Sequence, residues 1–186
     1  MEKIEQKPRI EVMLDMETCD VAETAAILEV ALVPFFLDST EEYDDGSICH
    51  TIDLTSCFME GMTFDSDTQR WWMERPAKAK WHFSMQEHHT IRHSMEKIYN
   101  YLEFLGETYE VHMWCRGLNF DLPKLERCFR VLLEKKEMPY RWWNVEDARC
   151  YCRNRGVHSS DVEFTGTPHT AESDCKHQIK LVQKAW

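Results

Sequence analysis

The order of the apolar segments constrains the fold most, because strand-like segments come first and helical periodicity follows. Residues 11–16 form a short apolar run, and residues 26–36 form a second run with Pro34 near its end. Residues 48–54 alternate between apolar and polar side chains, as a half-buried strand does. An acidic turn at residues 43–47 precedes this third segment. We therefore expect the three strands to form an antiparallel meander.

The rest of the chain alternates between helical and strand-like patterns. Residues 67–74 predict a short helix that Pro76 ends, and residues 91–105 predict a longer helix with Gly106 as its C-cap. Strands are expected at residues 111–115 and 142–145, the second followed by a brief helix. Further helices are expected at residues 122–132 and 171–182. This order predicts an α/β fold, a mixed β-sheet flanked by α-helices, in one domain over residues 1–186.

The charge of the chain is unevenly distributed. The formal net charge is −11, which by itself argues against a nucleic-acid partner. Residues 10–69, however, contain fifteen Asp and Glu and no Lys or Arg, whereas the remainder carries a net charge of +4. The part outside this acidic stretch is therefore able to face a phosphate backbone.

Membrane and secretory signals are not visible in the sequence. The longest uncharged apolar run, residues 30–37, is too short to span a bilayer, and the first residues lack the apolar core of a signal peptide. The eight Cys lie mostly within apolar patterns, which favours reduced core thiols over disulfides. We expect a cytoplasmic protein without a membrane partner.

Several familiar catalytic motifs are missing, and two zinc sites are weak candidates. The sequence has no Gly-rich phosphate loop, no dinucleotide-binding fingerprint and no serine-hydrolase elbow. A zinc ion would need Cys150 and Cys152 with His158, or His89 with His93. Paired Cys-x-x-Cys knuckles are absent, and no Glu follows His89. These residues are therefore expected to be ordinary surface or core residues.

Four carboxylates and one histidine occupy more informative positions. Asp15 and Glu17 are two residues apart on a strand, so both project to the same side and repel each other unless a cation lies between them. Asp121 opens a helix, where most Asp residues are simply caps. Asp174 lies in the first turns of the last helix, and His169 converges with it if His169 is in the preceding loop. The alternative for each residue is an ordinary solvated or capping role.

The combination resembles the three motifs of the DEDDh 3′–5′ exonucleases, which have a ribonuclease H-like fold. The matching residues are Asp15-x-Glu17, then Asp121 in Asn-Phe-Asp, then His169-x-Ala-x-x-Asp174, within residues 10–184. Thr68-x-x-Trp-Trp is similar to the Trp-Trp helix of the small mycobacterial adenosine-preferring exoribonuclease group and its phage and enterobacterial relatives. Gly117 has the spacing found in many relatives. The basic residue before it, Arg116, has no assigned role.

The resemblance implies a site and an activity. Asp15, Glu17, Asp121 and Asp174 would hold two divalent cations, Mg²⁺ or Mn²⁺, which suit oxygen ligands. His169 would take the proton of the attacking water. The expected reaction removes nucleoside 5′-monophosphates from the 3′ end of single-stranded nucleic acid, with RNA favoured over DNA.

The expected substrate-binding residues are Thr18, Trp71, Trp72 and Asn119. The two tryptophans would either offer a base-stacking surface or simply be buried. A catalytically inactive member that only binds nucleic acid or protein is the alternative function, and all five motif positions being filled favours the enzyme. A homodimer is a further expectation, by analogy with relatives.

Overall fold

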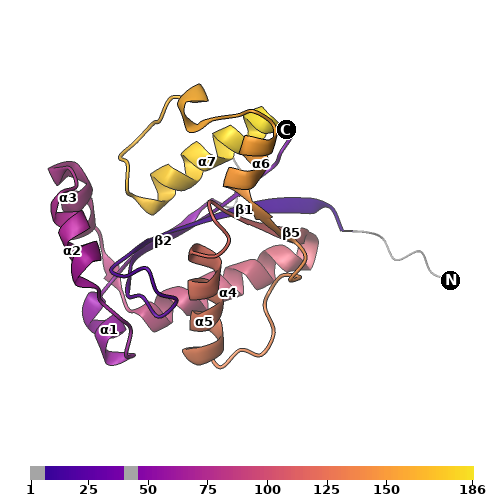
Figure 1. The fold of residues 1–186 in the computed structure, drawn as a ribbon. Helices are drawn as coiled ribbons and strands as arrows, with labels where there is room; N and C mark the ends of the chain where they lie inside the picture. Colours follow the sequence, from indigo (N-terminus) through magenta and orange to yellow (C-terminus); the bar gives the residue numbers. More distant parts are fainter. Residues whose placement is uncertain (1–6, 40–45) are drawn as a thin grey trace.

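The computed structural model describes residues 7–39 and 46–186, and a six-stranded mixed β-sheet lies at its centre (Figure 1). The order across the sheet is β4-β3-β2-β1-β5-β6. The strands are β1 (Arg9–Thr18), β2 (Ile27–Phe35), β3 (Ile48–Ile52), β4 (His88–His89), β5 (Glu110–Cys115) and β6 (Val145–Asp147).

The first three strands form the predicted antiparallel meander. β1 pairs with β2 and β2 with β3 in antiparallel orientation, whereas β5 adds to β1, β6 to β5 and β4 to β3 in parallel. Pro34 lies in β2 beyond Leu32, the last residue that β3 pairs with, so its missing N–H costs no hydrogen bond to β3. β1 is paired on both sides and carries the first two candidate carboxylates.

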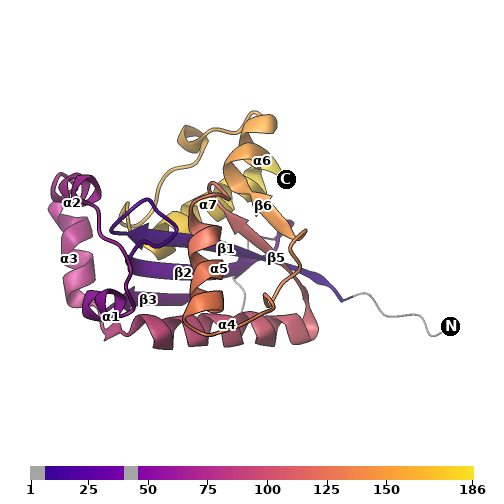
Figure 2. The same cartoon turned by 60° about the horizontal axis from the view of Figure 1, so that its bottom comes forward.

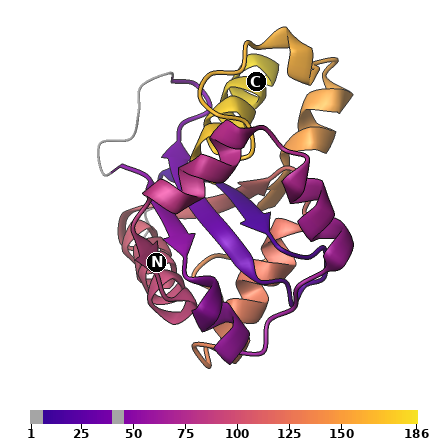
Figure 3. The same cartoon turned by 90° about the vertical axis from the view of Figure 1, so that its left-hand side faces the viewer.

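Helices cover both faces of the sheet, which confirms the predicted α/β class (Figures 1 and 2). Along β1, Val12 and Leu14 pack into a core with α4 and α5, and Met13 packs on the opposite face against α6 and α7. Figure 3 looks onto α1, α2 and α3, which lie together at one end of the sheet. The helices are α1 (Leu54–Met59), α2 (Ser66–Met73), α3 (Ala77–Met85), α4 (Ile91–Thr108), α5 (Asp121–Val131), α6 (Ala148–Asn154) and α7 (Ala171–Ala185).

Three predicted boundaries were wrong. β3 ends at Ile52 because Asp53 caps α1, its side chain accepting the Thr55 N–H at 2.9 Å. α4 continues through Gly106, and its last turn closes when the Tyr109 N–H donates to the Leu105 carbonyl at 2.8 Å. A glycine inside a helix costs only about 1 kcal/mol, which the buried face of α4 offsets.

The third error concerns the predicted strand at residues 142–145. β6 begins at Val145, and residues 142–144 form a turn in which the Asn144 N–H donates to the Arg141 carbonyl at 2.9 Å. Trp142 and Trp143, which made the segment look strand-like, are both exposed. Their size and β propensity imitate a buried strand, although no strand of the described sheet pairs with them.

Some elements were not predicted at all. α1, α3 and β4 are short, and their apolar residues show too little periodicity to identify them. Most of the turn expected at residues 43–47 lies outside the described residues. The other predicted helices and strands are present, with ends shifted by a few residues.

The structure also describes the state of the cysteines and the length of the helices. All eight Cys are free, and six of them are buried in the two cores. In the described part of the chain, no helix has both the length and the apolar character that crossing a bilayer requires.

Candidate active site

Asp15 and Glu17 lie near the C-terminal end of β1, on the face of the sheet that α7 covers. Asp15 Oδ1 accepts a hydrogen bond from Gln178 Nε2 of α7 at 2.7 Å. Glu17 is 9% exposed and lies just before a shift in the β1–β2 register. The side chains of Asp15 and Glu17 therefore point from β1 toward the N-terminal half of α7.

Asp121 reaches the same place from the other side of the sheet. It is the first residue of α5, and its Oδ1 accepts the backbone N–H of Met16 at 3.2 Å. Met16 lies two residues beyond Leu14, the last residue of β1 that β5 pairs with. Asp121 thus accepts a hydrogen bond from a β1 N–H beyond the end of the pairing with β5. This bond places the Asp121 carboxylate beside those of Asp15 and Glu17.

Asp174 and His169 come from the start of α7 and the loop before it. His169 lies in the loop before α7, the position from which it was expected to converge with Asp174. Its backbone is left-handed, with a φ of 63°. Its N–H donates to Asp174 Oδ2 at 2.9 Å, which closes the loop onto the first turn of the helix. Ligand atoms of Glu17, His169 and Asp174 lie within 4.8 Å of one another. The three sequence motifs thus meet in space.

The burial and close approach of the four carboxyl groups make their negatively charged forms unfavourable. Burial, and then the charges of Asp121, Glu17 and Asp174, hold the pKa of Asp15 well above its usual range. Burial, helped by Asp174, raises the pKa of Glu17 to about 8. Burial raises the pKa of Asp121 to about 7, although the nearby Lys124 ammonium opposes this rise. The pKa of Asp174 is also raised by burial.

An aromatic cluster borders the histidine. Trp71 and Trp72 of α2 meet edge to face with centroids 5.1 Å apart, and the Trp71 ring lies 5.0 Å from that of His169. Trp72 is held inside by a hydrogen bond from its Nε1 to the Thr18 carbonyl at 2.9 Å and by contact with Phe83. Trp71 remains 38% exposed, with the Arg75 guanidinium 4.2 Å from its ring centroid.

The other two expected substrate-binding residues are placed differently. Thr18 is buried, and its hydroxyl donates to the Asp20 carbonyl at 2.8 Å, so this hydroxyl supports the turn after β1. Asn119 is exposed in the turn between β5 and α5, two residues before Asp121. Gly117, with φ of 110°, starts that turn in a conformation that favours glycine.

Sequence reasoning missed several polar residues that support the site. Gln178 touches Asp15, and buried Lys124 donates from Nζ to the Phe120 carbonyl at 2.9 Å behind Asp121. Glu29 is 1% exposed and accepts the Ala171 N–H at 2.6 Å at the start of α7. Gln178 lies four residues after Asp174, hence on the same helix face, which is the one signal in the sequence that pointed to it.

Neither zinc candidate is assembled. The rings of His89 and His93 stack with centroids 5.5 Å apart. Nevertheless, Glu17, His169 and Asp174 are the only set of three ligand atoms mutually within 4.8 Å in residues 7–39 and 46–186.

The donor set of the carboxylate site fits hard divalent cations. Four carboxylates supply oxygen ligands, which Mg²⁺ and Mn²⁺ prefer over the nitrogen and sulfur that Zn²⁺ favours. The raised carboxyl pKa values show that the protein alone does not neutralise their charge. Asp15, Glu17, Asp121 and Asp174 are therefore the residues suited to hold the ions.

Comparison with solved structures defines the class of the fold. The nuclease domain of 3′hExo, a DEDDh family member bound to rAMP, matches with a TM-score of 0.61 at 13% identity over 95% of this chain and 91% of that one. The zinc-bound E. coli ExoI–ssDNA complex matches with a TM-score of 0.63 at 10% identity, over 95% of this chain but only 40% of that one. No curated protein matches the sequence.

The fold is ribonuclease H-like and is shared with DEDDh exonucleases. Within that class, the family model of the 3′–5′ exoribonuclease Rv2179c-like domain matches residues 10–186. The chain therefore belongs to the Rv2179c-like family, and its enzyme class is that of a 3′–5′ exonuclease.

Proposed function

We propose that this chain is a DEDDh-type, divalent-metal-dependent exonuclease that shortens single-stranded RNA from its 3′ end and releases nucleoside 5′-monophosphates. The observation that carries the proposal is the meeting of Asp15, Glu17, Asp121 and Asp174, drawn from β1, α5 and α7, with His169 beside them. RNA is proposed over DNA because the matching family is described as exoribonuclease.

The proposed chemistry divides between the carboxylates and the histidine. Two divalent cations held by the four carboxylates supply charge stabilisation for the attacking and leaving oxygens. His169 accepts the proton that the attacking water loses as the new P–O bond forms. The bond from phosphorus to the 3′ oxygen breaks, and that oxygen takes a proton from solvent. The site thus adds one water across each phosphodiester.

The surrounding residues orient these groups. The His169 N–H bond to Asp174 couples the position of the loop to that of a metal-binding carboxylate. Gln178 keeps Asp15 from rotating away, because its amide donates to one carboxylate oxygen. Trp71 lies beside His169 and offers an exposed ring on which the terminal base can stack.

The test uses strands labelled at either end. Single-stranded RNA and DNA of one sequence are incubated with the protein in Mg²⁺, Mn²⁺ or EDTA, and the products are resolved by length. The proposal expects a ladder that shortens from the 3′ end, mononucleotide products, faster loss of RNA and none in EDTA. Binding without shortening in every condition would favour an inactive nucleic-acid-binding member instead.

We further propose that this chain folds as one exonuclease domain and that this domain acts in the cytoplasm. Eight free thiols fit a reducing compartment better than an oxidising one. Pairing of two copies remains a prediction, which sedimentation of the purified protein would check.

A further inference from the structure

We propose that a basic pocket beside the carboxylates binds the phosphodiester groups of the strand on the 5′ side of the cleaved bond. The basic pocket consists of Arg116, Arg149, Arg153 and His158, with Gln178 among its lining residues. The proposal rests on the proposed function, since it names where the rest of the substrate lies.

Residues of α6 and α7 line most of the basic pocket. These two helices lie on the same face of the sheet (Figures 1 and 2). Its volume is about 450 Å³. Arg116 directly follows β5, whereas Arg149 and Arg153 are four residues apart and therefore share one face of α6. Three guanidinium groups from two separate elements thus line one cavity.

The acidic residues that the structure describes form no ion pair with these guanidinium groups. In residues 7–39 and 46–186, no carboxylate oxygen lies within 4.0 Å of Arg116, Arg149 or Arg153, although acidic residues outnumber basic ones in the chain. Arg92 and Arg130, by contrast, pair with glutamates at 2.9 and 3.0 Å. The positive charge of the basic pocket is therefore available to an anion.

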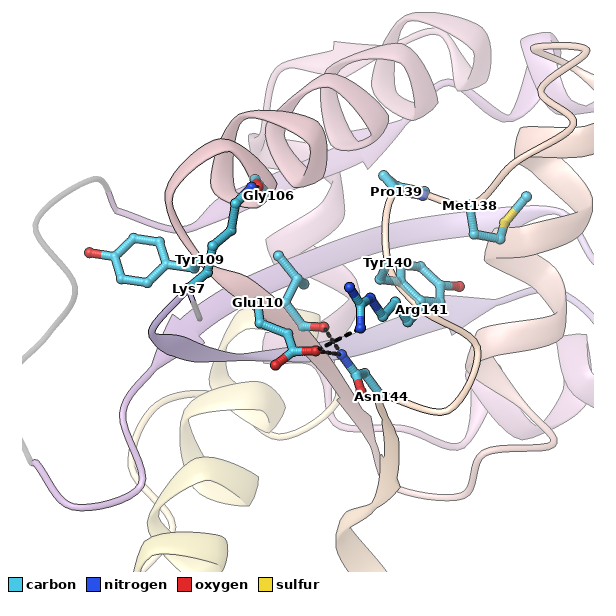
Figure 4. A pocket seen from close by; sticks show the side chains of 10 residues that line it. Lys7, Gly106, Tyr109, Glu110, Met138, Pro139, Tyr140, Arg141 and Asn144 are labelled. Carbon is cyan, nitrogen blue, oxygen red and sulfur yellow. Dashed lines mark hydrogen bonds and ion pairs between the residues drawn. The ribbon is translucent and has the colours of Figure 1, made fainter. Parts of the chain in front are cut away.

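A second pocket shows the contrast. Arg141 lines the pocket of Figure 4, and its Nη1 lies 3.5 Å from Glu110 Oε1, which also accepts from Asn144 Nδ2 at 3.3 Å. The one arginine of that pocket is thus already neutralised within the protein. The pocket of Figure 4 is similar in size to the basic pocket, but its arginine is not available to a phosphate group.

Gln178 connects the basic pocket to the reacting groups. Its Nε2 donates to Asp15 at 2.7 Å, and its residue is 4% exposed. Its Oε1 is buried and has no hydrogen-bond partner in the described residues. A buried acceptor without a partner costs free energy. Gln178 thus joins the basic pocket to Asp15 through one side chain.

The order of residues along α7 gives the direction of the strand. Trp71 packs on His169 before the helix, Asp174 lies in its first turns, and Gln178 follows one turn later. The aromatic residues and the basic pocket thus border the carboxylates at different points along α7. On the 3′ side of the cleaved phosphate there is one nucleoside and no further phosphate, whereas every nucleotide on the 5′ side adds one. The basic pocket must then hold the 5′ side.

The test measures binding without turnover. The affinity of a single-stranded RNA of about ten nucleotides, within the range that one groove accommodates, is measured by fluorescence anisotropy in Ca²⁺ at several salt concentrations. The double variant Arg149→Gln/Arg153→Gln is compared with Arg155→Gln. Arg155 is next to the same helix, but its guanidinium stacks on Tyr151 at 3.6 Å and is not among the lining residues.

The proposal expects weaker binding and a shallower salt dependence for the double variant. Losing two phosphate contacts reduces the slope of log affinity against log salt by about 1.4 for a single strand. Under turnover, the loss in kcat/KM grows with strand length from a dinucleotide upward. Arg155→Gln keeps the wild-type slope. Arg116, Arg149 and Arg153 are all exposed. Because Arg116 lies outside α6, Arg116→Gln provides an independent variant of the basic pocket.

Two outcomes separate this proposal from the proposed function. If the wild type shortens strands but the variants at Arg149, Arg153 and Arg116 keep its affinity and salt slope, the basic pocket is not a strand-binding site. If the slope depends on these arginines while the wild type shortens no strand, the basic pocket stands and the proposed function fails.

Discussion

The Trp71 indole and the His169 imidazole meet edge to face, with ring centroids 5.0 Å apart and ring planes at 81°. Its neighbour Trp72 instead donates its N–H to the Thr18 carbonyl and packs on Phe83. Adjacent positions on a helix point about 100° apart, which allows the two rings to face different surroundings. Trp71 therefore keeps an exposed ring beside His169, whereas Trp72 ties α2 to the end of β1.

This difference predicts opposite effects of two alanine substitutions. Trp71→Ala removes a half-exposed ring, so we expect a raised KM for single strands with little change in Tm. Trp72→Ala removes a partly buried hydrogen bond and an aromatic contact, so we expect a lower Tm. Steady-state kinetics and thermal unfolding of both variants check this. Equal losses of stability with no loss of affinity would make the pair purely structural.

Neutralising one carboxylate should abolish turnover and leave the fold intact. Asp15→Asn removes a charged oxygen ligand but keeps a group that can contact Gln178. We expect no measurable shortening of RNA and a smaller rise in Tm on adding Mg²⁺. The matched control is Asp38→Asn, which makes the same charge change at an exposed position. Wild-type turnover by Asp15→Asn would remove this carboxylate from the mechanism.

The role of His169 is separable from metal binding. His169→Ala should slow hydrolysis by about 10²- to 10⁴-fold, the usual loss of a general base. Because imidazole is a poor ligand for Mg²⁺, the variant should keep the Mg²⁺-dependent rise in Tm. Asp174→Asn should reduce that rise, which tests the other group in contact with the loop. If His169→Ala loses the rise as well, the histidine acts as a ligand.

The raised carboxyl pKa values predict a pH-dependent stability of the metal-free protein. Glu17 and Asp121 bind protons more tightly when folded, with pKa values of about 8 and about 7. The stability they contribute is complete below their ordinary pKa of about 4 and is lost as the pH rises through about 7 to 8. Thermal unfolding in EDTA and in Mg²⁺ across this range should show a Mg²⁺ effect that grows with pH.

Glu29 should support both stability and catalysis. Its Oε2 accepts the first N–H of α7, and its Oε1 lies 2.6 Å from His82 Nε2 of α3. Glu29→Gln places an amide group among these donors, which should cost about 1–3 kcal/mol of unfolding free energy. We also expect a lower kcat, because α7 carries Asp174. Glu60→Gln, at a surface ion pair with Arg92, is the control for charge loss.

The convergence of the candidate site residues was predictable because each of them lies in a short local pattern of the sequence. Asp15 and Glu17 share a strand face, and His169 was expected in the loop where it lies. The supporting residues were not predictable from local pattern. Glu29 is an ordinary strand residue in the sequence, and its contact with Ala171 spans 142 positions.

Errors in the fold came from residues whose local signal competes with tertiary packing. Gly106 is typical of a helix end, but the buried face of α4 continues to Leu105 and stabilises one more turn beyond it. Trp142 and Trp143 imitate a strand, although both are exposed in a turn. Arg116 had no interpretation in the sequence, because its neighbours in the basic pocket come from α6 and α7.

The long sequence separation between β1 and α7 also has a consequence for the synthesis of the protein. Synthesis proceeds from the N-terminus, so Asp15 and Glu17 leave the ribosome long before His169 and Asp174 do. Until α7 docks on β1 and β2, one face of the sheet remains uncovered and the carboxylate site is incomplete. A growing chain is thus unable to complete its carboxylate site until nearly all of this fold has emerged.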